Sequence, residues 1–153
     1  MAGLPHVETE IMRDMTMPYL SDAHATPTST KGLLAGRILS TLVVLFLLFD
    51  AVGKLLMVAP VVEGSTQLGY PESTVFGIGA VLLACTILYV IPRTSVLGAI
   101  LLTGYLGGAI ATHVRVGNPL FTHTLFPIYV AAMVWGGLYL REDRLRALLP
   151  VRD

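Results

Sequence analysis

The sequence ILSTLVVLFLLFDAVGKLLM, residues 38–57, decides the fold of this chain. A helix of about 20 apolar residues is long enough to cross a hydrocarbon core about 30 Å thick. Asp50 and Lys54 interrupt the run four positions apart, which places both side chains on one face of a helix, the acid before the base. Because a charge inside a membrane is costly, the pair is either a neutralising structural contact or part of a functional site.

The composition of the whole chain also indicates a membrane protein. Of its 153 residues, 54% are hydrophobic and 13% are charged, whereas an average soluble domain has about 25% charged residues. Four apolar segments stand out, at 33–58, 75–91, 95–114 and 120–140. Backbone groups in lipid must be hydrogen-bonded within their own segment, so these segments are predicted to be helices. One long and two short connections predict an all-α, antiparallel four-helix bundle that is integral to the membrane.

Prolines and capping residues determine the predicted connections. Pro60 is expected to stop the first helix. Residues 61–74 are expected to form a loop, in which Ser73 or Thr74 caps the second helix. Pro127 predicts a kink in the fourth span, which either opens a cavity or follows the curvature of the bundle.

The segments outside the spans are polar. Residues 1–32 contain no signal-peptide pattern and are predicted to be a disordered cytoplasmic tail, with Met15 and Met17 as alternative starts. Residues 33–140 form the predicted membrane domain, and residues 141–153 form a basic cytoplasmic tail.

The lysines and arginines near the spans predict the orientation. If both termini lie inside, six of these residues fall on the inner side and two on the outer side. The inner set is Lys31, Arg37, Arg93, Arg141, Arg144 and Arg146, and the outer set is Lys54 and Arg115. This difference predicts an N-in, C-in topology, with Trp135 and Tyr139 at the inner headgroup level.

Polar residues gather at the outer side of the predicted bundle. At about 1.5 Å per residue, Asp50 lies about 20 Å from Arg37 along the helix, in the outer third of the membrane. We call the candidate ligand-binding residues on that side the outer polar cluster: Asp50, Lys54, Glu63, Glu72, His113, Arg115 and His123. Polar groups that converge at the mouth of a helix bundle are typical of a ligand site.

Several of these residues also have a structural interpretation. His113 either belongs to the site or caps the C-terminal end of the third helix. Arg115 is expected to bind a lipid phosphate or a loop carboxylate. Gly104 and Gly108 form a GxxxG pair that either packs inside the bundle, which we favour, or forms a dimer interface.

Signals for cofactors and enzyme chemistry are weak. His113 and His123 are the only pair placed to ligate a metal or haem, and two histidines without ligand spacing argue against both. Cys85, the single cysteine, is expected to be a buried free thiol. The phosphate-loop, dinucleotide, zinc-protease and serine-hydrolase motifs are missing, and the net charge is zero. We therefore expect no nucleic-acid partner and a protein that is not an enzyme on its own.

Several stretches together resemble one known family. They are AGRILSTLVVLFLLFDAVGKLL, VVEGSTQLGYPEST, LLACTILYVIPRTSVLGAILLTGYLGGAIATHVRVGNPLFTH and WGGLYLREDRLRALLP, within about residues 33–150. In these stretches the chain is similar to the DoxX-like family of small bacterial membrane proteins. The resemblance implies a multi-pass, four-helix protein of the inner (plasma) membrane. The family takes its name from subunits of a thiosulfate:quinone oxidoreductase, and other relatives are linked to redox homeostasis; no catalytic residues carry over.

The resemblance and the outer polar cluster together lead to a functional hypothesis. We expect a membrane protein that binds a hydrophobic ligand of quinone type, as an accessory or subunit of a redox system. His113 would hydrogen-bond a carbonyl, Asp50 would accept or relay a proton, and Lys54 would hold the charge state of the acid. Two alternatives stay open: a homo-oligomeric small-solute transporter or exporter, and a membrane scaffold without ligand chemistry.

Overall fold

The structure, a computed structural model, describes residues 30–142 and 145–146. The predicted N-terminal tail up to residue 29, and most of the C-terminal tail with Arg144, lie outside the described residues. The described part is helical and contains no strand. Its elements are α2 (Thr30–Leu55), α3 (Ala59–Gln67), α4 (Glu72–Val90), α5 (Ser95–Val116), a π-helical turn η1 (Leu120–Thr124) and α6 (Phe126–Arg141).

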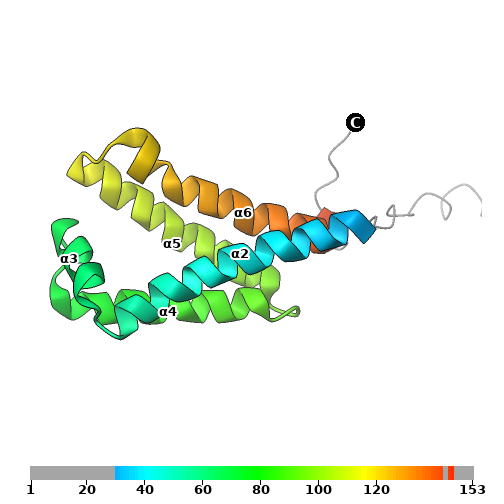
Figure 1. Cartoon of the computed structure of the whole chain (residues 1–153), viewed down its shortest axis with the longest axis horizontal. Coiled ribbons are helices and arrows are strands. Elements are labelled where there is room, and N and C mark those ends of the chain that lie inside the picture. Colours follow the sequence, from blue (N-terminus) through cyan, green and yellow to red (C-terminus); the bar gives the residue numbers. More distant parts are fainter. Residues whose placement is uncertain (1–29, 143–144, 147–153) are drawn as a thin grey trace, which may run out of the picture.

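Four segments are long and apolar enough to cross a membrane: α2, α4, α5, and η1 together with α6. α2 packs against α4 and α6, and α5 packs against the same two helices, so the four spans form a ring. Consecutive spans run in opposite directions, and α2 begins at the end where α6 finishes (Figure 1). We call this the tail end of the bundle, and the opposite end the α3 end. The predicted all-α fold with four membrane helices is confirmed.

The tail end is held together by a buried tyrosine. The Tyr89 hydroxyl of α4 donates to the carbonyl of Val134 in α6 at 2.9 Å and accepts from Ser40 Oγ of α2 at 3.2 Å. The Arg141 guanidinium donates to the Tyr89 carbonyl at 3.1 Å and lies 4.9 Å from its ring centroid. Tyr89 is completely buried, so its hydroxyl needs these partners. One side chain thus links three helices.

Large apolar side chains point outward along every span. Phe49 is 79% exposed and Phe121 is 74% exposed, and exposed leucines, isoleucines and valines occur on the same helices and on the other spans. In a soluble protein such a surface would be a liability, whereas in a bilayer it is the face that contacts the acyl chains.

The first connection differs from its prediction. α2 ends at Leu55 rather than at residue 58, because Met57 adopts the left-handed conformation at φ 50°. Around it the Val58 amide donates to the Gly53 carbonyl at 3.0 Å and the Met57 amide donates to the Lys54 carbonyl at 3.2 Å, the pattern of a Schellman cap. The predicted helix stop at Pro60 is therefore wrong.

Pro60 instead lies in the first turn of α3, within the segment predicted to be a loop. A first-turn amide has no partner within its own helix, so proline loses nothing there. The predicted caps Ser73 and Thr74 are also wrong: the N-cap position of α4 is Pro71, and no side chain caps it. Thr74 Oγ1 donates to the Pro71 carbonyl at 2.8 Å.

The fourth span begins with a π-helical turn and continues as an α-helix. Its first five residues form η1, and α6 begins at Phe126 with Pro127 in its first turn. The Leu125 amide donates to the Leu120 carbonyl at 2.8 Å, five residues back, which makes the turn wider than an α-helical one. The helix type thus changes just before Pro127, and the predicted kink at Pro127 stays a prediction.

Candidate functional site

A cavity of about 1030 Å³ lies between the spans in the half of the bundle toward the α3 end. All four spans and α3 contribute to its wall. Its polar lining residues are Asp50, Lys54, Ser65, Gln67, Tyr70, Thr74, Tyr105, Thr112, His113, Asn118 and His123. Leucine, isoleucine, valine and phenylalanine side chains from the same helices line the remainder of the wall. The cavity therefore combines an apolar interior with hydrogen-bonding groups.

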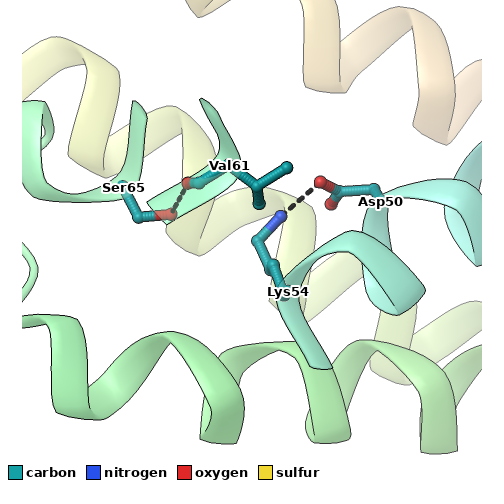
Figure 2. A network of polar contacts seen from close by, with 4 residues as sticks. All are labelled: Asp50, Lys54, Val61 and Ser65. Atoms are coloured by element: carbon teal, nitrogen blue, oxygen red, sulfur yellow. Dashed lines mark hydrogen bonds and ion pairs between the residues drawn. The ribbon is translucent and has the colours of Figure 1, made fainter. Parts of the chain in front are cut away.

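Asp50 and Lys54 form an ion pair on the wall of this cavity. The Lys54 ammonium donates to Asp50 Oδ1, as the four-residue spacing predicts. The Lys54 side chain is 13% exposed and the Asp50 side chain is 33% exposed, so the acid is the more accessible partner. Figure 2 shows Lys54 reaching from α2 toward the carboxylate, with Val61 and Ser65 of α3 beside the pair. The lysine is thus shielded and the acid faces the cavity.

α3 is attached to α2 at this point. A Cβ added to Gly53 would lie 3.1 Å from Val61 Cγ2, so the two helices touch. Ser65 is buried and its Oγ donates to the Val61 carbonyl at 2.8 Å, which satisfies the hydroxyl within α3. α3 consequently forms the wall of the cavity beside the ion pair.

Two histidines lie together on the opposite wall. The ring centroids of His113 in α5 and His123 in η1 are 5.9 Å apart. Asn118 Nδ2 lies 2.8 Å from His113 Nδ1, and because an amide nitrogen only donates, the ring nitrogen accepts. The hydrogen of the neutral His113 ring is then on Nε2. His123 Nδ1 is 2.7 Å from Thr122 Oγ1.

The end of α5 does not use the His113 side chain as a cap. Gly117 at φ 76° ends the helix, and the Asn118 amide donates to the His113 carbonyl at 3.0 Å. His113 lies in the last turn of α5, and a favourable interaction of its side chain with the helix dipole stays a prediction. Among the described residues, no three histidine, cysteine, aspartate or glutamate side chains gather as metal ligands.

The wide turn η1 explains why His123 faces the cavity. A π-helical turn holds more residues than an α-helical turn and so rotates the side chains that it contains, and such turns are frequent at functional sites. Thr124, at the end of η1, is buried, while His123 next to it lines the cavity.

The structure brings together four residues of the outer polar cluster: Asp50, Lys54, His113 and His123 all line the cavity. Glu63 is exposed on α3 and is not among the lining residues. Glu72 lies in the first turn of α4, where the helix dipole stabilises a carboxylate, and it does not line the cavity either.

Arg115 also lies outside the cavity wall. Its guanidinium donates to the Leu68 carbonyl at 2.9 Å, and a Cβ added to Gly69 would lie 3.1 Å from Arg115 Nη2. The loop partner of Arg115 is therefore a backbone carbonyl, not the predicted carboxylate. The contact ties α5 to the segment that follows α3.

Several residues that line the cavity are not part of the outer polar cluster that the sequence predicted. Thr112 Oγ1 donates to the Gly108 carbonyl at 2.9 Å and therefore accepts from the Tyr70 hydroxyl at 2.6 Å. Tyr105 lies on the same wall of α5. Tyr105, Ala109, Thr112 and Val116 recur at intervals of three and four, so a search for a mixed polar face on the third span would have found this wall.

Gly104 and Gly108 do not pack against another helix. A Cβ added to either would meet no atom within 4 Å, and both residues line the cavity. The interpretation that this pair packs inside the bundle is therefore wrong. Close helix contacts occur instead at Gly36, Gly79, Gly98 and Gly137, where an added Cβ would lie 2.8 Å or less from a neighbouring helix. The dimer interpretation of the pair stays a prediction.

Comparison with known proteins gives one match. The sequence model of the DoxX-like family matches residues 38–137, which include the cavity and most of all four spans. No curated protein and no solved structure matches the chain.

Proposed function

Because the chain belongs to the DoxX-like family and has an amphipathic cavity within its membrane helices, we propose that it binds a small lipid-soluble ligand of quinone type. The protein acts as an accessory or subunit of a membrane redox system. It lies in the inner membrane of a bacterium, with both termini in the cytoplasm. The ligand head occupies the cavity at the α3 end.

The observation that supports this proposal is the composition of the cavity wall. A volume of about 1030 Å³ is at the upper end of small-molecule sites, which span about 300–1,000 Å³. Such sites combine apolar walls with a few polar groups that orient the ligand. Here the polar groups come from α2 on one wall and from α5 and η1 on another.

Each ionisable group has a distinct role in this proposal. A quinone head presents two carbonyl oxygens, and His113 donates to one of them through Nε2. Asp50 accepts or relays the proton that the head releases or takes up when its redox state changes. Lys54 holds the Asp50 carboxylate in place by donating to its Oδ1. Electrons come from a redox partner, so the chain supplies binding and proton positions.

The test is to measure quinone that copurifies with the protein in a mild detergent, by mass spectrometry of the extract. We expect roughly stoichiometric quinone with the parent protein and its loss from Asp50→Asn and His113→Ala. Glu63→Gln is the matched control, because Glu63 is a carboxylate at the same end but outside the cavity wall. Unchanged occupancy in both cavity variants would contradict the proposal.

A small-solute transporter that acts as a homo-oligomer is the second candidate, because the fourth span contains a π-helical turn on the cavity wall. Such turns are frequent at functional sites, and here η1 places His123 in the cavity. Native mass spectrometry in mild detergent tests this candidate. A dimer is expected if two copies form one transporter, whereas a strict monomer argues against it.

A further inference from the structure

Side-chain contacts bridge three of the four seams between neighbouring spans beside the cavity, within the part of the chain that the structure describes. At the α2/α4 seam, a Cβ added to Gly79 would lie 2.6 Å from Lys54 Cβ, so the helices touch. At the α2/α6 seam, Phe46 and Phe126 meet edge to face with ring centroids 5.4 Å apart. A hollow of about 230 Å³ lies on the same seam and shares these two rings with the cavity.

The seam between α5 and the fourth span is closed by aromatic rings as well. His113 and His123 stand 5.9 Å apart there, centroid to centroid. Nearer the tail end, Trp135 Nε1 of α6 donates to Thr103 Oγ1 of α5 at 2.9 Å on the exposed side of these helices. The two contacts join α5 to η1 at the α3 end and to α6 nearer the tail end.

The α4/α5 seam is different. α4 and α5 meet at the tail end, where a Cβ added to Gly98 would lie 2.2 Å from the Tyr89 nitrogen, and they diverge toward the α3 end (Figure 1). In the divergent part, the cavity wall includes Gly77 of α4 and Gly104 and Gly108 of α5. All three are exposed, and an added Cβ would meet no atom within 4 Å at any of them.

The opening between α4 and α5 is limited both toward the tail end and toward the α3 end. The close approach at Gly98 limits it toward the tail end. At the α3 end, the Tyr70–Thr112 hydrogen bond of 2.6 Å joins the segment before α4 to α5. We call the glycine-lined gap between these edges the α4/α5 portal, defined by Gly77, Gly104 and Gly108.

The α5 side of the portal lies near the middle of its span, whereas Gly77 lies nearer the α3 end of α4. α5 runs from Ser95 to Val116, and Gly104 and Gly108 come 9 and 13 residues after its first residue. At about 1.5 Å per residue, they lie about 14 and 20 Å along the helix. Since a hydrocarbon core is about 30 Å thick, a molecule in the portal contacts acyl chains and not headgroups.

We propose that the apolar chain of the bound ligand leaves the cavity through the α4/α5 portal and lies among the acyl chains. The inference rests on the proposed function and narrows the ligand to an amphipathic molecule with a compact polar head and a long hydrocarbon chain. The polar groups on the wall satisfy the head, and the glycines leave room for a chain to pass. The hydrocarbon chain of the ligand then needs no space inside the cavity.

The test compares two probes with the protein in phosphatidylcholine nanodiscs. One is ubiquinone-10, which has a long isoprenoid chain, and the other is ubiquinone-0, which has the same head without the chain. The variants are Gly104→Leu and Gly108→Leu, with Gly77→Leu on the opposite wall as an independent variant. Gly107→Leu is the matched control, because Gly107 is also exposed with open space around its Cβ position but does not line the cavity.

The measured quantity is the ratio of the two dissociation constants, so that any general loss of head binding cancels. We expect the portal variants to weaken binding of the long-chain probe relative to the short one by about tenfold or more, because a leucine overlaps the path of the chain. The control should stay within about twofold of the parent protein, which is well below the tenfold effect. Thermal unfolding of each variant verifies that it is folded.

The outcomes separate the two proposals. Portal variants with the same ratio as Gly107→Leu overturn the portal and leave the proposed function standing. Equal losses in Gly104→Leu, Gly107→Leu and Gly108→Leu also overturn it, since a dimer interface on this face would produce that pattern. If the parent binds neither probe, the proposed function fails. If mass spectrometry instead finds a stoichiometric phospholipid that the portal variants lose, the portal is supported and the quinone-type head is wrong.

Discussion

Asp50 and Lys54 are held where neither charge is fully hydrated. The helix places them one turn apart, and the cavity leaves the acid more accessible than the base. The attraction between them offsets the cost of removing each from water, and removal of one partner leaves the other charge uncompensated. Their geometry follows from local helix geometry alone, but their partial burial depends on α3 and α4 packing around them.

We expect Lys54→Met to lower the free energy of unfolding by about 1–3 kcal/mol, less than for a fully buried pair because Asp50 keeps some solvent contact. The double variant Asp50→Leu with Lys54→Met should lose less than Lys54→Met alone, because no unpaired charge remains. Detergent unfolding followed by the fluorescence of Trp135, the only tryptophan, measures both. Additive effects of the two substitutions would show that the pair is not coupled.

The glycines of α5 have two different kinds of surroundings. In α5, Gly98 sits against the backbone of α4, whereas Gly104, Gly107 and Gly108 have open space where a side chain would be. Both kinds of glycine occur within one helix, and small residues allow close approach only where a neighbour is present. α5 is thus packed tightly at one end and forms one wall of the cavity at the other.

At the scale of this element, we expect Gly98→Ala to destabilise the protein by about 1–3 kcal/mol, because the added methyl would overlap the Tyr89 backbone. Gly107→Ala in the same helix should be neutral or stabilising by about 0.5–1 kcal/mol, since alanine loses less conformational entropy and meets no atom. Thermal unfolding in the same detergent compares the two. Equal effects would contradict the assigned helix contact.

For the molecule as a whole, the arrangement of charge and cavity is asymmetric along the membrane normal. The tail end contains Arg141 and the turn with Arg93, while α3, the ion pair and the histidines lie toward the other end. Positive residues near the spans favour the cytoplasmic side. The cavity is therefore predicted to face the outer side of the membrane.

Labelling with a membrane-impermeant maleimide tests this orientation in intact cells. The native Cys85 is buried and is the only cysteine, so it should remain unlabelled. Gly64→Cys on α3, which is exposed with open space around it, should react from outside. Arg93→Cys, in the exposed turn before α5, should react only after the membrane is permeabilised. The reverse pattern would mean that the cavity faces the cytoplasm.

The four apolar spans, their antiparallel order and the Asp50–Lys54 pairing could all be predicted from the amino-acid sequence. Each of these depends on segment length or on the helical repeat, and both are local properties. The convergence of Asp50, Lys54, His113 and His123 followed from topology, because alternating helices bring their ends together at one side of the membrane.

The remaining features depend on how the helices pack in three dimensions. Proline is compatible with both the end and the first turn of a helix, and in this fold the Pro60 segment forms α3, with Val61 packed on Gly53. The π-helical turn before Pro127, the carbonyl partner of Arg115 and the roles of the glycines depend on which atoms of other helices lie nearby. Contacts between residues far apart in the sequence set those positions, and no local periodicity encodes them. The open α4/α5 seam belongs to the same class, since it exists only where two packed helices diverge.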